Sequence, residues 1–278
     1  MRLLFLRENV RAAFDMRRSE VLSSTAKNDI RKFPDMQTIF LRAQDSAADA
    51  FSVPRGLTAL VGGGGKTTLM LRLAGELCAR GERVIVTTTT HIFPPEHMRT
   101  LHGATEAQAA RALAEDGIVC LGEPSKEGKI AAPVLPPETM LRLADYVLCE
   151  ADGARKRPLK APAAHEPVIP PQTKLVIAAA GLDGIGKPVC ETAFRPELYA
   201  ALIQKDETDP VAPADIARVL SHEDGQKKGV LSGMRYCILL NKADGEAQKR
   251  DALLIAQALE NANAAERTVI AALGGGNA

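Results

Sequence analysis

Short apolar runs alternate with amphipathic segments from Leu57 to the end of the chain. The apolar runs predict strands at 57–61, 83–88, 117–121, 145–150, 174–180, 235–240 and 268–273. The amphipathic segments predict helices at 67–80, 106–115, 136–143, 196–204, 213–220 and 246–261. Strands that alternate with helices are typical of a parallel sheet covered on both faces. The pattern therefore predicts a doubly wound α/β fold with a mostly parallel sheet and three αβα layers.

Residues 1–50 do not follow this pattern. They carry scattered Arg and Lys and only a weak helical spacing of apolar residues, and the segment 37–51 could be a helix that leads into the first strand. Two alternatives remain open: translation could start at Met36, or the residues before it could form an extension that packs on the domain or binds a partner. We therefore assign residues 1–50 to an N-terminal extension and 51–278 to the α/β domain.

A glycine run separates the first predicted strand from the first predicted helix. A lysine and two threonines follow it, so the stretch reads Gly62, Gly63, Gly64, Gly65, Lys66, Thr67 and Thr68. Glycines let the backbone turn tightly and point its N–H groups at an anion, and the helix N-terminus adds partial positive charge. In such a loop Lys66 reaches the terminal phosphates of a nucleotide and Thr67 ligates Mg²⁺. We therefore expect a P-loop that binds GTP or ATP with Mg²⁺.

The spacing of this loop is shorter than the common form G-x-x-x-x-G-K-[ST], which would need a glycine where this chain has Leu60. The chain instead has Gly62-x-x-Gly65-Lys66-Thr67, which is similar to the loop of the Mur-type ligases. This similarity implies a P-loop domain of the SIMIBI or Mur-like NTPase kind.

Two carboxylates mark the end of the predicted strand at 145–150. Glu150 is its last residue, and Asp152 lies in the loop that follows. Ligands of an open α/β sheet bind outside the carboxyl ends of the strands. A P-loop enzyme needs carboxylates there to hold Mg²⁺ or to orient a water beside the γ-phosphate. We therefore take Lys66, Glu150 and Asp152 as catalytic residues, and we expect Thr67, Glu150 and Asp152 to hold Mg²⁺.

Other polar residues follow the predicted strands at 83–88 and 145–150. They are Thr89, Thr90 and His91 after the first strand, and Arg155, Lys160 and His165 after the second. Hydroxyls at a strand end can bond phosphate oxygens, a histidine can act as a base or ligand, and basic residues can clamp an anionic substrate. The alternative is ordinary, because threonine favours strands and a charged loop is usually solvated. We keep all six as candidate contacts to substrate or phosphate.

The segment Asn241-Lys242-Ala243-Asp244 directly follows the predicted strand at 235–240. It resembles the NKxD motif of GTPases, in which the aspartate accepts hydrogen bonds from the ring N–H and the exocyclic amino group of guanine. The asparagine bonds the other edge of the base, and the lysine stem covers its face. A polar turn with Asp244 as a helix N-cap is the alternative. We expect Asn241, Lys242 and Asp244 to bind the nucleotide base, with guanine preferred.

Composition narrows the function classes. The net charge is +1 and aromatic residues make up 4% of the 278 residues, without tryptophan. These values argue against a protein that coats nucleic acid or a membrane surface. The five cysteines show no metal-ligand spacing and fit a reducing compartment. No apolar run has the length of a membrane span, so we expect a cytoplasmic protein.

Taken together, the motifs resemble the YqeC-type family of selenium-dependent hydroxylase accessory proteins. The segments that carry the resemblance are VGGGGKTTLM, VTTTTHI, CEADGARKRPLKAPAAHEPVIP, AGLDGIGKP and LNKAD, and it extends from Leu57 to the C-terminus. The resemblance implies a P-loop nucleotide-binding protein that helps to mature selenium-dependent molybdenum hydroxylases. More distantly, the short loop and the late NKxD resemble the metallocentre-assembly GTPases, whose Cys/His metal ligands are not visible in this sequence.

We therefore expect a domain that binds GTP or ATP with Mg²⁺ and hydrolyses it slowly, so that hydrolysis gates an assembly step on a molybdenum enzyme or its cofactor. The expected partners are the nucleotide and a client molybdenum hydroxylase or its maturation factors, and a homodimer is an open alternative. Two other functions remain: an ATP-dependent ligase or kinase for a small anionic substrate, and a non-catalytic nucleotide-dependent scaffold.

Overall fold

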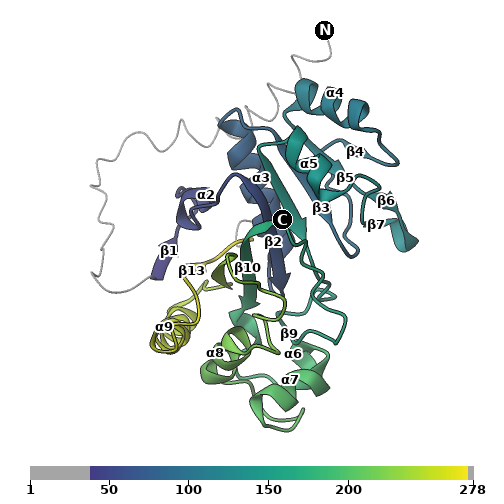
Figure 1. The fold of residues 1–278 in the computed structure, drawn as a ribbon. Helices are drawn as coiled ribbons and strands as arrows, with labels where there is room; N and C mark the ends of the chain where they lie inside the picture. The colour runs from purple at the N-terminus through teal and green to yellow at the C-terminus, as the bar shows by residue number, and fades with distance from the viewer. Residues whose placement is uncertain (1–37, 275–278) are drawn as a thin grey trace, which may run out of the picture. The chain divides into compact units, whose positions relative to one another are not determined.

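The computed structural model describes residues 38–274 and contains a nine-stranded sheet that is parallel throughout. Its strands, in spatial order, are β1 (Thr38–Leu41), β13 (Arg267–Ala271), β12 (Arg235–Asn241), β10 (Thr173–Gly181), β2 (Gly56–Gly62), β8 (Tyr146–Glu150), β3 (Val84–Thr88), β5 (Ile118–Leu121) and β4 (Thr100–Leu101). The predicted doubly wound α/β fold is confirmed (Figure 1).

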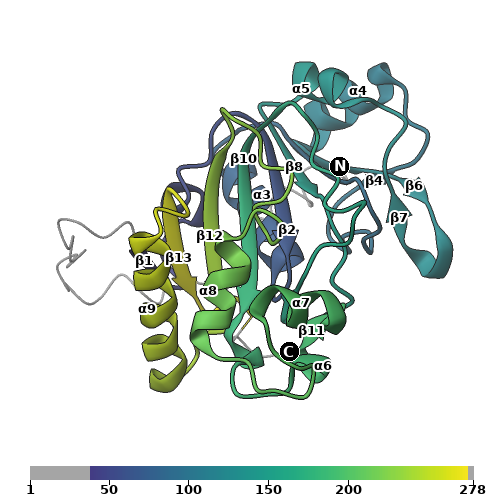
Figure 2. The same ribbon diagram turned by 60° about the horizontal axis from the view of Figure 1, so that its bottom comes forward.

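Helices cover both faces of this sheet. They are α2 (Ala47–Ala50), α3 (Lys66–Ala79), α4 (Glu106–Asp116), α5 (Pro137–Leu143), α6 (Val189–Thr192), α7 (Pro196–Ile203), α8 (Pro213–Ser221) and α9 (Glu246–Asn261). Short 3₁₀ turns lie at η1 (Lys126–Gly128) and η2 (Leu182–Gly184). Figure 2 shows α8 and α9 on one side of the strands and α3 on the other. Among the described helices, none combines the length and the apolar sequence that crossing a membrane requires.

Alternation along each strand separates the two layers of the core. In β2, Ala59 and Val61 pack with the layer that contains α4, α5, α7, α8 and α9, whereas Leu60 packs with the layer that contains α2 and α3. Successive side chains of a strand point to opposite faces, so a strand covered on both faces must be apolar at nearly every position. This is why the strands appear in the sequence as continuous apolar runs.

Two small sheets lie outside the main sheet. The hairpin of β6 (Glu123–Pro124) and β7 (Ile130–Ala131) is antiparallel and lies beside β5 (Figure 1). The pair of β9 (Leu159–Lys160) and β11 (Ala193–Phe194) is parallel, with Lys160 opposite Phe194. The second pair matters for the site below, because it fixes the segment that follows β8.

The segment at 37–51 is not the helix that the sequence suggested. Thr38–Leu41 forms the edge strand β1, which pairs in parallel with β13, and only Ala47–Ala50 is helical. A four-residue strand is too short to show a clear period in the sequence. The described residues, 38–274, belong to one compact unit that holds the sheet. The rest of the predicted extension and the alternative start at Met36 lie outside the described residues.

The order of the strands reverses at β2. The chain places β3, β4, β5 and β8 on one side of β2, and then β10, β12 and β13 on the other. Ligands of open α/β sheets bind outside the carboxyl ends of the strands, at such a reversal. The carboxyl ends of β2, β8 and β12 are Gly62, Glu150 and Asn241, so the fold brings the predicted site residues to one edge.

Candidate functional site

The glycine loop joins β2 to α3 in a conformation that requires glycine. Gly62, Gly64 and Gly65 have φ values of 92°, 72° and 133°, which side chains rarely adopt. A Cβ atom on Gly62 would lie 2.3 Å from the Ala179 carbonyl oxygen, and one on Gly64 would lie 2.3 Å from the Gly181 amide nitrogen. The loop is therefore packed directly against the end of β10.

The backbone N–H groups of this loop fall into two groups, one with hydrogen-bond acceptors and one without. The N–H groups of Gly63 and Gly64 donate to the carbonyl oxygens of Ala179 (2.9 Å) and Arg157 (3.2 Å). The next four, from Gly65 to Thr68, make no hydrogen bond to any described residue, and no side chain caps α3. Unpaired N–H groups at a helix N-terminus form a ready site for an anion, because the helix dipole also favours negative charge there.

Lys66 is buried against the acidic residues of β8. Its ammonium donates to the carbonyl oxygens of Gly62 and Asp152, both at 2.7 Å, and pairs with the Asp152 carboxylate. Glu150 Oε1 lies 3.6 Å from the same nitrogen. Burial alone would lower the pKa of Lys66, but attraction to Asp152 and Glu150 outweighs it, so the pKa of this ammonium lies above its ordinary value. Lys66 therefore carries a positive charge at neutral pH.

Thr67 and Glu150 form the part of the site that fits a divalent cation. The exposed Thr67 hydroxyl donates to Glu150 Oε2 at 2.7 Å. Mg²⁺ is held in nucleotide sites by one or two protein oxygens together with phosphates and water, and this oxygen pair suits it. The Asp152 carboxylate already accepts from two ammonium groups and the Gly62 N–H, whereas Glu150 has the Thr67 hydroxyl and only a 3.6 Å contact to Lys66, so Asp152 fits such an ion less well. Within residues 38–274 no group of three or more His, Cys, Asp or Glu side chains could hold a metal by itself.

A buried ionic network extends from Asp152 away from the glycine loop. Lys160 Nζ lies 3.0 Å from Asp152 Oδ2 and 2.9 Å from Glu166 Oε2, and Glu166 in turn pairs with Arg195. Burial would raise the pKa of Glu166, but hydrogen bonds from Lys160 and Arg195 outweigh it, so the pKa of this carboxyl lies below its ordinary value. Sequence reasoning did not single out Glu166 or Arg195. The motif His165-Glu166-Pro167 was the only signal for Glu166.

Asn241, at the end of β12, links the glycine loop to the segment that follows β13. Its amide nitrogen donates to the Gly64 carbonyl oxygen at 2.8 Å, and its amide oxygen accepts from the Leu273 N–H at 2.8 Å. Lys242 has a φ of 65°, and its ammonium pairs with Asp183 Oδ2 at 2.7 Å. Asp244 is exposed and has no hydrogen bond or ion pair to the described residues. Of the three polar residues of this segment, Asn241 contacts the glycine loop, Lys242 pairs with Asp183, and the exposed Asp244 carboxylate is unpaired among the described residues.

The other predicted contact residues lie around this centre in different ways. The Thr89 hydroxyl donates to the Val168 carbonyl oxygen, and the Thr90 hydroxyl lies 3.2 Å from that of Thr88. Both hydroxyls thus have partners within the protein. His91 and His165 are exposed. Arg155 is also exposed and lies over the Phe194 ring. Lys160, by contrast, is fully buried and faces Asp152, so it does not present its charge to solvent.

We expect Asn241→Ala to destabilise the folded chain by about 2–4 kcal/mol, because the Leu273 N–H and the Gly64 carbonyl would both lose a partner. Guanidinium unfolding followed by circular dichroism measures this loss. Gln257→Ala removes an exposed helical amide and should change the free energy of unfolding by less than about 0.5 kcal/mol. Equal effects of the two variants would contradict the anchoring role of Asn241.

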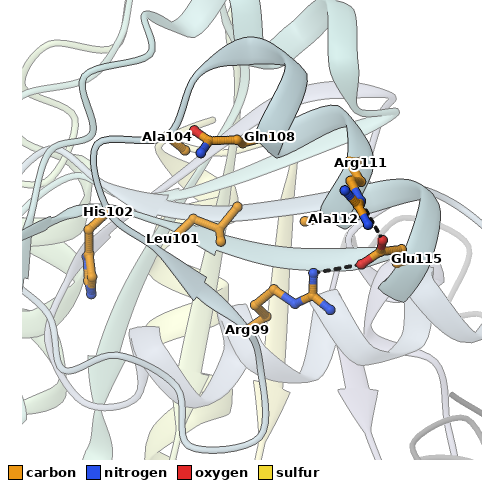
Figure 3. A pocket seen from close by; sticks show the side chains of 8 residues that line it. All are labelled: Arg99, Leu101, His102, Ala104, Gln108, Arg111, Ala112 and Glu115. Carbon is orange, nitrogen blue, oxygen red and sulfur yellow. Dashed lines mark hydrogen bonds and ion pairs between the residues drawn. The ribbon is translucent and has the colours of Figure 1, made fainter. Parts of the chain in front are cut away.

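A separate hollow of about 320 Å³ lies between β4 and α4 (Figure 3). Leu101 lines it, and two arginines lie on its rim: Arg111 pairs with Glu115, and Arg99 pairs with Glu115 and Asp116. Its cations are therefore neutralised. It also lies at the far edge of the sheet, three strands beyond β8 in the spatial order, so it is separate from the site at the glycine loop.

The fold and the site define a parallel α/β protein with a glycine-rich, lysine-bearing loop at the strand-order reversal. The family model described as YqeC protein matches residues 58–197. The uncharacterized protein YqeC of Escherichia coli (strain K12) is 34% identical over an alignment of 192 residues, which covers 66% of this chain and 74% of the relative. The chain therefore belongs to the YqeC family. The matched region contains the glycine loop, Glu150, Asp152 and the ionic network, whereas Asn241 and Asp244 lie beyond the family-model match.

Proposed function

We propose that this YqeC-family protein binds GTP or ATP with Mg²⁺ at the glycine loop and hydrolyses it slowly. The observation that supports this most strongly is the set of free N–H groups from Gly65 to Thr68, which begins the helix that also carries Lys66 and Thr67. Four such donors beside a buried ammonium form a cradle for a polyphosphate.

The residues around the loop have separate roles in this proposal. Lys66 and the loop N–H groups stabilise the charge on the transferring phosphoryl group, and Thr67 and Glu150 hold Mg²⁺. Asp152 pairs with Lys66 and thereby holds its ammonium beside the loop. The bound ion supplies charge neutralisation at the phosphates.

The process served by hydrolysis is proposed from the family resemblance. We propose that turnover gates a maturation step on a selenium-dependent molybdenum hydroxylase or its cofactor, in the cytoplasm. A kinase or ligase for a small anionic substrate is a second candidate. One observation favours it: the exposed basic residues Arg155, Lys156 and Arg157 lie in a segment whose Arg157 carbonyl contacts the glycine loop.

Nucleotide turnover separates these functions. The proposal predicts slow GTP or ATP hydrolysis that a client hydroxylase accelerates and that small anionic molecules do not. Stimulation by a small phosphorylated or carboxylated molecule, with no response to the client, would instead support the kinase or ligase. Tight binding without turnover, even with the client present, would leave a nucleotide-dependent scaffold.

Asp244→Ala is expected to lower the affinity for GTP about 10- to 100-fold and to leave the affinity for ATP unchanged. The free Asp244 carboxylate would accept two hydrogen bonds from guanine that adenine cannot donate, and bonds to a charged group contribute about 1.5–3 kcal/mol. Calorimetric titration of both nucleotides with Mg²⁺ measures the preference, with the exposed Asp206→Ala as the control. An unaltered GTP/ATP ratio would disprove base recognition by Asp244.

A further inference from the structure

One carboxylate is shared by two buried lysines. Asp152 Oδ1 pairs with Lys66, and Asp152 Oδ2 lies 3.0 Å from Lys160 Nζ. The three side chains are 1%, 4% and 0% exposed, for Asp152, Lys66 and Lys160 respectively. Breaking a buried ion pair by removing one partner is strongly unfavourable, because it leaves a charge without compensation. A lysine that leaves Asp152 therefore needs a second cation to remain there.

The charges around Asp152 balance one another. Three cations, Lys66, Lys160 and Arg195, face three carboxylates, Glu150, Asp152 and Glu166. If Lys66 turns to a bound phosphate, as the proposed function requires, Lys160 is the cation that still contacts Asp152. The Gly62 N–H, which donates to Asp152 Oδ2 at 2.9 Å, is its other remaining partner.

Several contacts hold the Lys160 side chain in place, so it cannot move with Lys66 toward a bound phosphate. Its ammonium also donates to the Gly153 carbonyl oxygen at 2.6 Å and pairs with Glu166. Its own carbonyl oxygen accepts from Gln226 at 2.6 Å, and its backbone belongs to β9, which pairs with β11. Its position is thus set by contacts that do not involve the glycine loop.

We propose that Lys160 is a positioning residue that holds the Asp152 carboxylate, and thereby releases Lys66 to the phosphates of a nucleotide. Lys160 acts through Asp152 and does not touch the nucleotide. The inference rests on the proposed function, because it concerns the transfer of Lys66 from Asp152 to a phosphate.

A double-mutant cycle between Lys160→Met and Asp152→Asn tests this role, with GDP and ADP as probes in EDTA, so that no metal ligand is involved. Lys160→Met should lower the affinity about tenfold, because Lys66 becomes the only ammonium on Asp152 and is held back. Asp152→Asn frees Lys66, so the affinity should be equal to or above that of the wild type. In the Asp152→Asn background, Lys160→Met should have no further effect.

Two results would overturn the inference. If Lys160→Met lowers the affinity by the same factor in both backgrounds, Lys160 contacts the nucleotide or only supports the fold. Glu166→Gln provides a second measurement if Lys160→Met does not fold. This substitution removes the carboxylate that competes with Asp152 for Lys160, so it should raise the affinity for GDP and ADP two- to threefold. An equal or lower affinity contradicts the proposal. Wild-type protein that binds neither MgGTP nor MgATP would refute the proposed function itself.

Discussion

Lys66→Ala is expected to lower the affinity for Mg²⁺-nucleotide about 100-fold while the chain remains folded. The substitution removes the buried ammonium that would contact the phosphates, and each hydrogen bond to a charged group contributes about 1.5–3 kcal/mol. Equilibrium binding of a fluorescent GTP or ATP analogue measures the loss.

Stability must be followed in the same variant. Removing Lys66 takes one cation from Asp152 and Glu150, and we expect the free energy of unfolding to fall by about 3 kcal/mol. Asp152 keeps Lys160 and the Gly62 N–H, which limits this loss. The exposed Lys187→Ala is the control for removal of a positive charge and should change neither quantity. A folded Lys66→Ala protein with wild-type affinity would contradict the role of Lys66.

Gly62→Ala is expected to have the largest effect on stability, about 3–5 kcal/mol. Its new Cβ atom would lie 2.3 Å from the Ala179 carbonyl oxygen, in a backbone that cannot yield without moving β10. The φ of 92° adds strain of its own. Thermal and guanidinium unfolding both measure the loss.

Gly233→Ala is a matched control for this effect. Gly233 has a φ of 90°, close to that of Gly62, but a Cβ atom there would meet no heavy atom within 4 Å. Its cost should therefore be limited to the conformational strain, about 1–2 kcal/mol. Equal losses in the two variants would show that the close approach of the glycine loop to β10 contributes nothing.

The gathering of the site residues was predictable from the sequence. Gly62, Glu150 and Asn241 each follow an apolar run, and parallel strands bring such positions to one edge of the sheet. The short loop spacing did not obscure this, because the lysine and threonine still begin a helix directly after a strand. The apolar pattern of the strands and their order along the chain are thus enough to predict that these residues meet at one edge of the sheet.

The ionic network was not predictable from the same signals. Lys160 belongs to a basic run that is typical of a solvated loop, yet it is buried in β9, which pairs with β11 and directs its ammonium to Asp152 and Glu166. Both strands have only two residues. Strands of this length leave no periodic pattern, so nothing in the sequence indicates that Glu166 and Arg195 meet there. The edge strand β1 escaped notice for a similar reason.

The roles of neighbouring carboxylates were also beyond the sequence. Glu150 and Asp152 are two residues apart and looked equivalent, but Glu150 accepts from Thr67, whereas Asp152 bonds Gly62 and both lysines. Which oxygen meets which donor depends on how the loop after β8 folds back. That path is set by tertiary contacts, among them the one between the Gly64 N–H and the Arg157 carbonyl oxygen.

Hydrogen exchange of the wild-type chain with and without saturating MgGTP tests the central claim most directly. The account predicts slower exchange of the amides from Gly65 to Thr68, which have no partner among the described residues and would gain one from the phosphates. Amides of α9, on the far side of the sheet from α3, should be unaffected. Saturable binding that leaves exchange at the glycine loop unchanged and protects another segment would contradict it.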